Sequence, residues 1–166
     1  ITVVGIYATA DGDGILNILN KDGKTVAGLR AHADGGMLGI FNKDEKAVAG
    51  IYATSDGGLL GILNKDGETV VELLAVEDGG ALEIRNKDEK VVAGIYAHAD
   101  GGVLNILNKD DNTVAGIYAK ADGGKVSVAN NDGDMVVELL APADGGGLLG
   151  ILNKDGNAVV GIYADA

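Results

Sequence analysis

The sequence predicts an all-β protein made of tandem two-strand repeats, and three observations lead to this fold class. A unit of about 22 residues recurs from one end of the chain to the other. Short stretches rich in Val, Ile and Tyr alternate with turns rich in Asn, Asp and Gly. No stretch has helical periodicity, and Trp and Cys are absent.

The repeats form one array over residues 1–166. Seven units begin at Thr2, Thr25, Ala47, Thr69, Val91, Thr113 and Met135, and a half unit covers residues 158–166. Because the array starts with a whole unit and stops halfway through another, we expect it to be a region of a longer fibre. A uniform array repeats one surface, whereas an enzyme needs one asymmetric pocket, so the pattern favours an architectural or binding role.

Each unit is expected to hold two strands and two turns. Residues 113–119 represent the first strand and residues 60–64 the second. The Asp-Gly-Gly turns begin at Asp34, Asp56, Asp78, Asp100, Asp122 and Asp144. The Asn turns, mostly Asn-Lys-Asp, begin at Asn20, Asn42, Asn64, Asn86, Asn108, Asn130 and Asn153. Asn and Asp initiate turns through their own side chains, so the second pattern predicts a type I hairpin turn with a bulge.

Alternation along each strand separates two faces. Leu60 and Ile62 represent positions that stay apolar in every unit, which predicts a core face. The other face is mixed, too apolar to be fully solvated, and is expected to meet another chain or layer. The candidate assembly residues on this mixed face are Tyr7, Tyr52, Tyr96, Tyr118, Tyr163, Phe41, Leu63 and Leu107.

Composition narrows the classes of partner. The formal net charge of −12 argues against nucleic acid and anionic membrane surfaces. No run of apolar residues is long enough for a transmembrane helix, so membrane insertion is not expected. The apolar content is mainly Ala, Val, Ile and Leu, with 28 glycines, which suits a thin interior with closely spaced backbones.

Three architectures compete to explain these patterns, with parallel or antiparallel strand order left open. The favoured one is a β-helix or β-solenoid-like fibre in which several chains share one slim apolar core. The alternative is a single-chain β-roll, in which equivalent Asp residues would stack about 4.8 Å apart and require bound cations. The third is a closed antiparallel barrel, which would be too wide for Ala, Ile and Leu to fill.

The unit Val-Ala-Gly-Ile-Tyr-Ala, Asp-Gly-Gly, Leu-x-Ile-Leu-Asn-Lys-Asp-Gly resembles tandem hairpin repeats in uncharacterised bacterial proteins. The resemblance covers essentially the whole chain and consists mostly of turn residues. More loosely, the chain is similar to the β-rich shafts of phage fibres and surface filaments. These resemblances imply a repetitive β-fold and no catalytic residues.

Few residues suggest chemistry. His32 and His98 occupy equivalent strand ends where other units carry Thr, Val, Lys or Pro, so we expect them to be exposed and structural. Glu72 and Glu83 could form a carboxylate pair, but the favoured interpretation is a cross-strand ion pair of one of them with Arg85.

Calcium is the one ligand class that the turns suggest. The candidate ligands are Asp11 and Asp13, but each turn supplies few carboxylates and the nine-residue calcium repeat is missing. No cofactor and no catalytic residue is therefore expected.

The sequence as a whole predicts a structural protein that is not an enzyme. We expect it to form the shaft of an extracellular fibre, filament or spike at a cell or virion surface. Its partner would be itself, as a trimer or filament. The alternative is a monomeric β-roll that binds carbohydrate, calcium or a protein.

Overall fold

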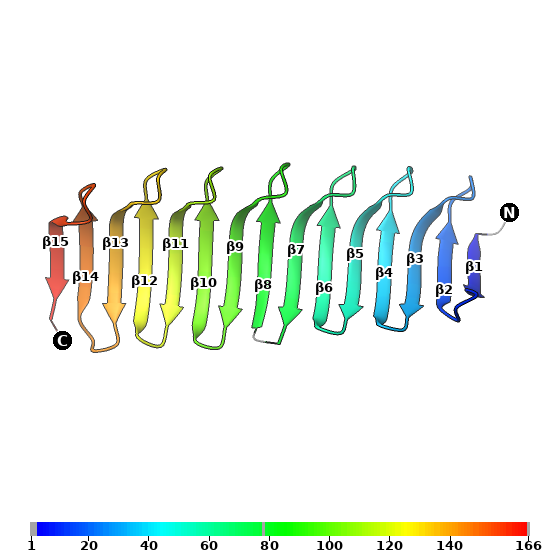
Figure 1. The fold of residues 1–166 in the computed structure, drawn as a ribbon, viewed down its shortest axis with the longest axis horizontal. Helices are drawn as coiled ribbons and strands as arrows, with labels where there is room; N and C mark the ends of the chain where they lie inside the picture. The colour runs from blue at the N-terminus through cyan, green and yellow to red at the C-terminus, as the bar shows by residue number, and fades with distance from the viewer. Residues whose placement is uncertain (1–2, 78, 166) are drawn as a thin grey trace. The chain divides into compact units, whose positions relative to one another are not determined.

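The computed structural model describes residues 3–77 and 79–165, and these fold into β-strands joined by turns, without helices (Figure 1). Thr2, Asp78 and Ala166, which belong to the predicted units and turns, lie outside the described residues. The all-β fold class and the tandem two-strand repeats are therefore confirmed.

The strands correspond closely to the predicted repeat halves. They are β1 (Val4–Ala8), β2 (Gly14–Leu19), β3 (Thr25–His32), β4 (Gly35–Phe41), β5 (Ala47–Thr54), β6 (Gly57–Leu63), β7 (Thr69–Val76), β8 (Gly79–Arg85), β9 (Val91–His98), β10 (Gly101–Leu107), β11 (Thr113–Lys120), β12 (Gly123–Ala129), β13 (Met135–Pro142), β14 (Gly147–Leu152) and β15 (Ala158–Ala164). The chain divides into two compact units, Ile1–Gly80 and Ala81–Ala166.

The strand order in the sheet follows the order in the chain, and the sheet is open. Pairing is antiparallel from β1 to β7 in the first unit and from β9 to β15 in the second. The expectations of a β-helix or solenoid, and of a β-roll with parallel ladders, are thus wrong. The reason lies in the connections: only two residues separate Thr54 from Gly57, and parallel pairing needs a long crossover.

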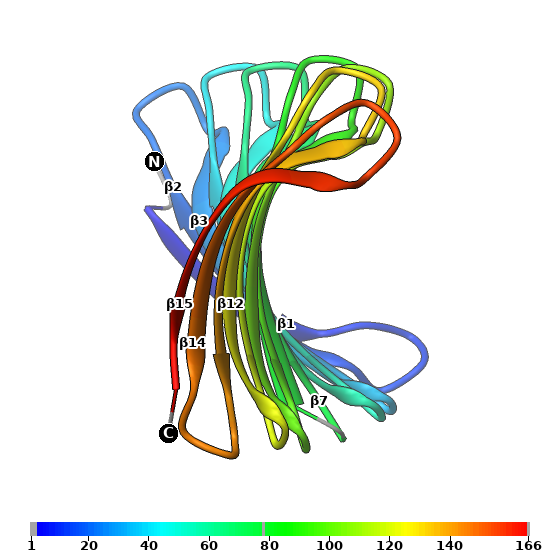
Figure 2. The ribbon, with the colours of Figure 1, turned by 90° about the vertical axis from the view of Figure 1, so that its left-hand side faces the viewer.

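The Asn-Lys-Asp turns have the predicted type I geometry with a bulge. Asn64 Oδ1 accepts hydrogen bonds from the backbone N–H groups of Asp66 and Glu68, at 2.8 and 3.1 Å. Gly67, at φ 90°, donates its N–H to the carbonyl of Asn64. The pairing register shifts between Ile62 and Leu63, just before the turn. Bulges bend strands, and Figure 2 shows strands within each unit curving along their length.

The Asp-Gly-Gly turns need glycine at their second position. Gly35 has φ 148°, and a Cβ there would lie 1.9 Å from the carbonyl oxygen of Ala53. Gly101 repeats this arrangement, with 1.8 Å to the carbonyl oxygen of Ala119. Both the backbone angle and the close approach of the next hairpin exclude a side chain here.

The predicted core face is not buried within the chain. No hydrophobic side chain among the described residues is buried, and Ile62 remains 47% exposed. Leu60, beside it on the same face, is 41% exposed. A recurring apolar row indicates burial only when a second layer covers it, and this sheet is a single layer.

Candidate functional site

In each unit, one face of the sheet carries two rows of apolar side chains, and we call it the isoleucine face. Its large residues alternate with the Gly and Tyr positions along each strand. In the first unit the more exposed of them are Val4, Ile6, Ile18, Leu29, Leu38, Ile40, Ile51, Leu60, Ile62 and Leu73. In the second unit they are Ile84, Ile95, Ile106, Ile117, Val126, Val128, Leu139, Leu149, Ile151, Val160 and Ile162.

The first row of the isoleucine face runs straight across the strands. Leu38 pairs with Leu29 on one side and Ile51 on the other, and Leu60 then pairs with Ile51 and Leu73. In the second unit an equivalent row passes through Leu104, Ile117 and Val126 and continues through Leu139, Leu149 and Ile162. Cross-strand neighbours of this kind form an unbroken apolar ridge.

The second row alternates large and small residues in most of the sheet. Ala27 pairs with Ile40, Ile40 with Ala49, and Ala49 with Ile62. The second unit repeats the pattern, with Ile106 between Ala93 and Ala115. Since strands lie about 4.8 Å apart, the large side chains stand about 10 Å apart with hollows between them.

The opposite face, which we call the tyrosine face, holds every assembly candidate named from the sequence. Tyr52, Leu63 and Leu107 are half-buried, whereas Tyr7 and Tyr163 are exposed. The ring of Tyr52 lies over Gly50, as those of Tyr96, Tyr118 and Tyr163 lie over Gly94, Gly116 and Gly161. Phe41 lies over Gly39 in the same way, and the hydroxyl of Tyr7 accepts a hydrogen bond from Asn17 Nδ2 at 2.9 Å. Aromatic rings thus cover much of the glycine row on this face.

A polar cluster interrupts the tyrosine face at β8 and β9. Arg85 Nη2 donates to Glu83 Oε2, and the hydroxyl of Tyr96 donates to Glu83 Oε1 at 3.2 Å. This ion pair of Arg85 with Glu83 lies within β8, and the cross-strand ion pair expected from the sequence stays a prediction. Burial, and then the neighbouring Glu83 carboxylate, raise the pKa of Tyr96 above its usual value. Glu72 lies half-buried on β7.

The histidines and the calcium candidates lie at strand ends. His32 Nδ1 is 2.8 Å from Asp13 Oδ2, and the ring of His98 stacks on Tyr96 with centroids 6.3 Å apart. Asp11 is exposed. Among the described residues, no group of three or more His, Cys, Asp or Glu side chains is placed to hold a metal ion. Whether Asp11 and Asp13 bind calcium stays a prediction.

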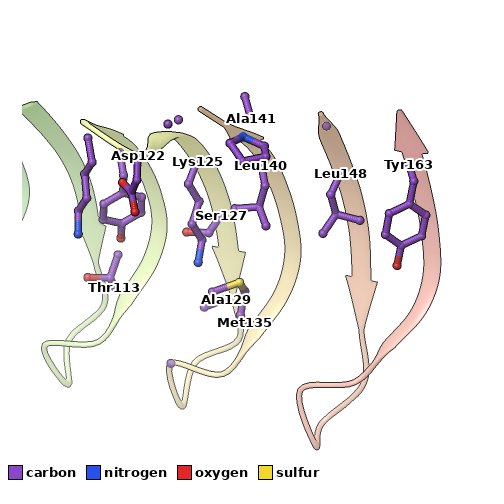
Figure 3. Close-up of a pocket in the computed structure, with 17 residues that line it drawn as sticks. Thr113, Asp122, Lys125, Ser127, Ala129, Met135, Leu140, Ala141, Leu148 and Tyr163 are labelled. Carbon is purple, nitrogen blue, oxygen red and sulfur yellow. The ribbon is translucent and has the colours of Figure 1, made fainter. Parts of the chain in front are cut away.

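One pocket in the second unit breaks the uniformity of the tyrosine face (Figure 3). Its volume is about 780 Å³, and its lining includes Tyr118, Lys125, Ser127, Leu140 and Tyr163. Figure 3 shows Lys125, Leu148 and Tyr163 carried by separate strands around this space. A volume of this size is typical of small-molecule sites.

The pocket arises where β12 departs from the repeat. Ala129 occupies a position that holds a larger side chain in the other units: Leu19, Phe41, Leu63, Arg85, Leu107 and Leu152. Lys125 and Ser127 also replace the apolar residue and the Gly, Asn or Glu found at equivalent positions. The sequence did not lead us to predict this pocket. Lys125, Ser127 and Ala129, three successive residues on one face of β12, all differ from the repeat pattern, and this difference could have indicated the pocket.

Comparisons with known proteins return no match: neither a protein-family model nor a curated protein sequence matches this chain. Across residues 3–77 and 79–165, the structure has no helix long and apolar enough to cross a membrane.

Proposed function

We propose that this chain is a structural protein that assembles with copies of itself through the isoleucine face. The observation that carries the proposal is the pair of apolar rows, which are continuous across the strands of each unit and are not buried within the chain. An assembly of this kind suits the shaft of an extracellular fibre, filament or spike. It requires no catalytic group, and the expectation that the protein is not an enzyme stays a prediction.

The exposed apolar area is comparable to the area that an interface between two sheets buries. The apolar side chains of the isoleucine face, each about half exposed, present on the order of several hundred Å² in each unit, as much as the largest patch on a typical monomer. A stable interface buries about 800 Å² on each partner. The rows of one or two units therefore supply the area that a stable pairing of two sheets needs.

The shape of the second row favours another copy as the partner. Ile40 and Ile62 project on either side of the hollow at Ala49, so an equivalent isoleucine from a second sheet would fit into that hollow. Packed sheets lie about 10 Å apart with interdigitating side chains. A ridge and a hollow of matching size on the same surface make that surface complementary to itself.

The distribution of charged residues also favours the isoleucine face as the assembly surface. On β3–β7 and β9–β15, alternation places no charged residue on the isoleucine face. Among the described residues of these strands and the turns between them, the charged groups lie in turns or on the tyrosine face, so two isoleucine faces can approach without burying a charge. The absence of charge therefore favours this face over the tyrosine face, four of whose Tyr rings also pack on their own glycines.

The test is the mass of the full chain in solution across a concentration series, by sedimentation velocity and light scattering. The unmodified protein is expected to form oligomers or filaments. Ile62→Lys combined with Ile106→Lys places one charge on the isoleucine face of each unit, at sites 47% and 40% exposed. We expect this variant to remain folded by circular dichroism and to be monomeric.

Thr54→Lys is the matched control, because Thr54 is an exposed strand end on the tyrosine face and Lys120 occupies the equivalent position. This control should assemble like the unmodified protein. A native protein that is monomeric at every concentration, or a folded Ile62→Lys, Ile106→Lys variant that assembles normally, would refute the proposal.

A further inference from the structure

We infer that the pocket on the tyrosine face of β11–β15 binds a neutral, linear oligosaccharide. The pocket lies on the face opposite the one proposed for assembly, so the two inferences are independent. Its basis is the break in the repeat at Lys125, Ser127 and Ala129, which makes this surface different from its equivalents elsewhere in the array.

The pocket is elongated across the strands. One row of paired residues crosses it, from Tyr118 to Lys125, then Leu140, Leu148 and Tyr163. All five residues line the pocket. The two tyrosines stand four strands apart, or about 19 Å at the usual strand spacing. A linear chain of several sugar rings fits this length better than a compact ligand.

The two tyrosines form aromatic surfaces at the ends of the row. A Cβ on Gly116 would lie 2.4 Å from the Tyr118 hydroxyl and 2.5 Å from its ring, so this ring lies against the backbone. Tyr163 lies over Gly161 in the same way, at 2.7 Å, and is 68% exposed. A ring held on the sheet by one face presents its other, electron-rich face outward, where it attracts the weakly positive C–H groups of a sugar ring.

The polar groups between the tyrosines match hydroxyls rather than an ion. Lys125 Nζ lies 3.9 Å from Glu138 Oε2, and Lys120, Asp122, Ser127 and Thr113 also line the pocket. Lys120, Lys125 and Asp122 line the pocket, and the Glu138 carboxylate lies beside Lys125, outside the lining. With Glu138 included, the charges in and around the pocket balance, so the site has no strong preference for a charged ligand. Donors and acceptors of both kinds suit sugar hydroxyls, which both donate and accept hydrogen bonds.

Calorimetric titration of the full chain with cellohexaose, maltohexaose and chitohexaose tests the inference. At least one of these neutral oligosaccharides is expected to bind with a Kd below about 1 mM. Tyr118→Ala and Tyr163→Ala should each weaken that binding by about tenfold or more, equivalent to the loss of one aromatic contact. Tyr52→Ala, the equivalent change in the first unit, should leave the Kd unchanged.

Ala129→Leu provides the decisive variant, because it restores the side chain that Leu63 and Leu107 supply in other units and narrows the pocket at its Ala129 end without adding charge. We expect this variant to fold and assemble like the unmodified protein and to lose sugar binding. The inference is overturned if none of the three oligosaccharides binds, or if binding survives both Ala129→Leu and the two tyrosine changes.

Discussion

The ring of Tyr52 lies over Gly50, two residues earlier on the same strand, so closely that a Cβ at position 50 would be 2.7 Å from the ring. Gly50 is buried, and its backbone does not have a positive φ. The glycine is therefore needed for the space above it rather than for its backbone angle. Gly94 with Tyr96 and Gly116 with Tyr118 repeat the same relationship.

Gly50→Ala should destabilise the protein by about 1–3 kcal/mol, because the added methyl group must displace the Tyr52 ring or the strand. The free energy of unfolding from urea denaturation measures this effect. Gly61→Ala is the matched control in the adjacent strand, where a Cβ would meet only Leu59 and Leu63 at 3.6 and 3.8 Å. That change should be neutral or slightly stabilising. Equal losses in the two variants would contradict the role given to the Tyr52 ring.

Glu45→Gly should stabilise the protein by about 1 kcal/mol, because Glu45 holds φ 59° at the turn position where Gly67 has φ 90°. Thermal unfolding, followed by circular dichroism, gives the measurement. Gly67→Ala makes the reverse change in the next turn and should lower stability by a similar amount. A loss of stability in Glu45→Gly would show that the glutamate side chain contributes more than its backbone angle costs.

Glu83→Gln should lower the pKa of Tyr96 without restoring it fully, because burial remains the largest cause of the rise. The phenol keeps its proton more tightly in the folded state, so its contribution to stability is fully present below the ordinary pKa of 10.0 and is lost as pH rises through the higher folded pKa. Phenolate absorbance, in a background where the other four tyrosines are Phe, reports this pKa. An unchanged or higher pKa in Glu83→Gln would mean that the Glu83 carboxylate does not act on the phenol.

Local chemistry made the turns and strands predictable. Asn64 and Gly67 specify their turn through hydrogen bonds and a backbone angle within five residues, so no distant contact is needed to foresee it. The position of Ile62 was different. Its strict apolar character indicated a covered face, but pattern alone does not say whether the cover comes from the same chain or from another one.

The candidate site was less accessible from sequence for a related reason. The repeat pattern is defined by the residues that the units share, whereas the pocket depends on the large side chain that β12 lacks at Ala129. The contact of the Tyr52 ring with Gly50 was also unforeseen. The two residues lie two positions apart on one strand, and whether the ring covers the glycine depends on the rotamer of Tyr52.

Within the described parts of each unit, every strand contacts only the strands that precede and follow it in the chain. The protein therefore has very low contact order for an all-β fold. Proteins dominated by such local contacts fold quickly, since little loop-closure entropy opposes each step. Folding could begin at any hairpin and spread outward, and loss or duplication of one 22-residue unit during evolution would rejoin strands of the same kind in the same register.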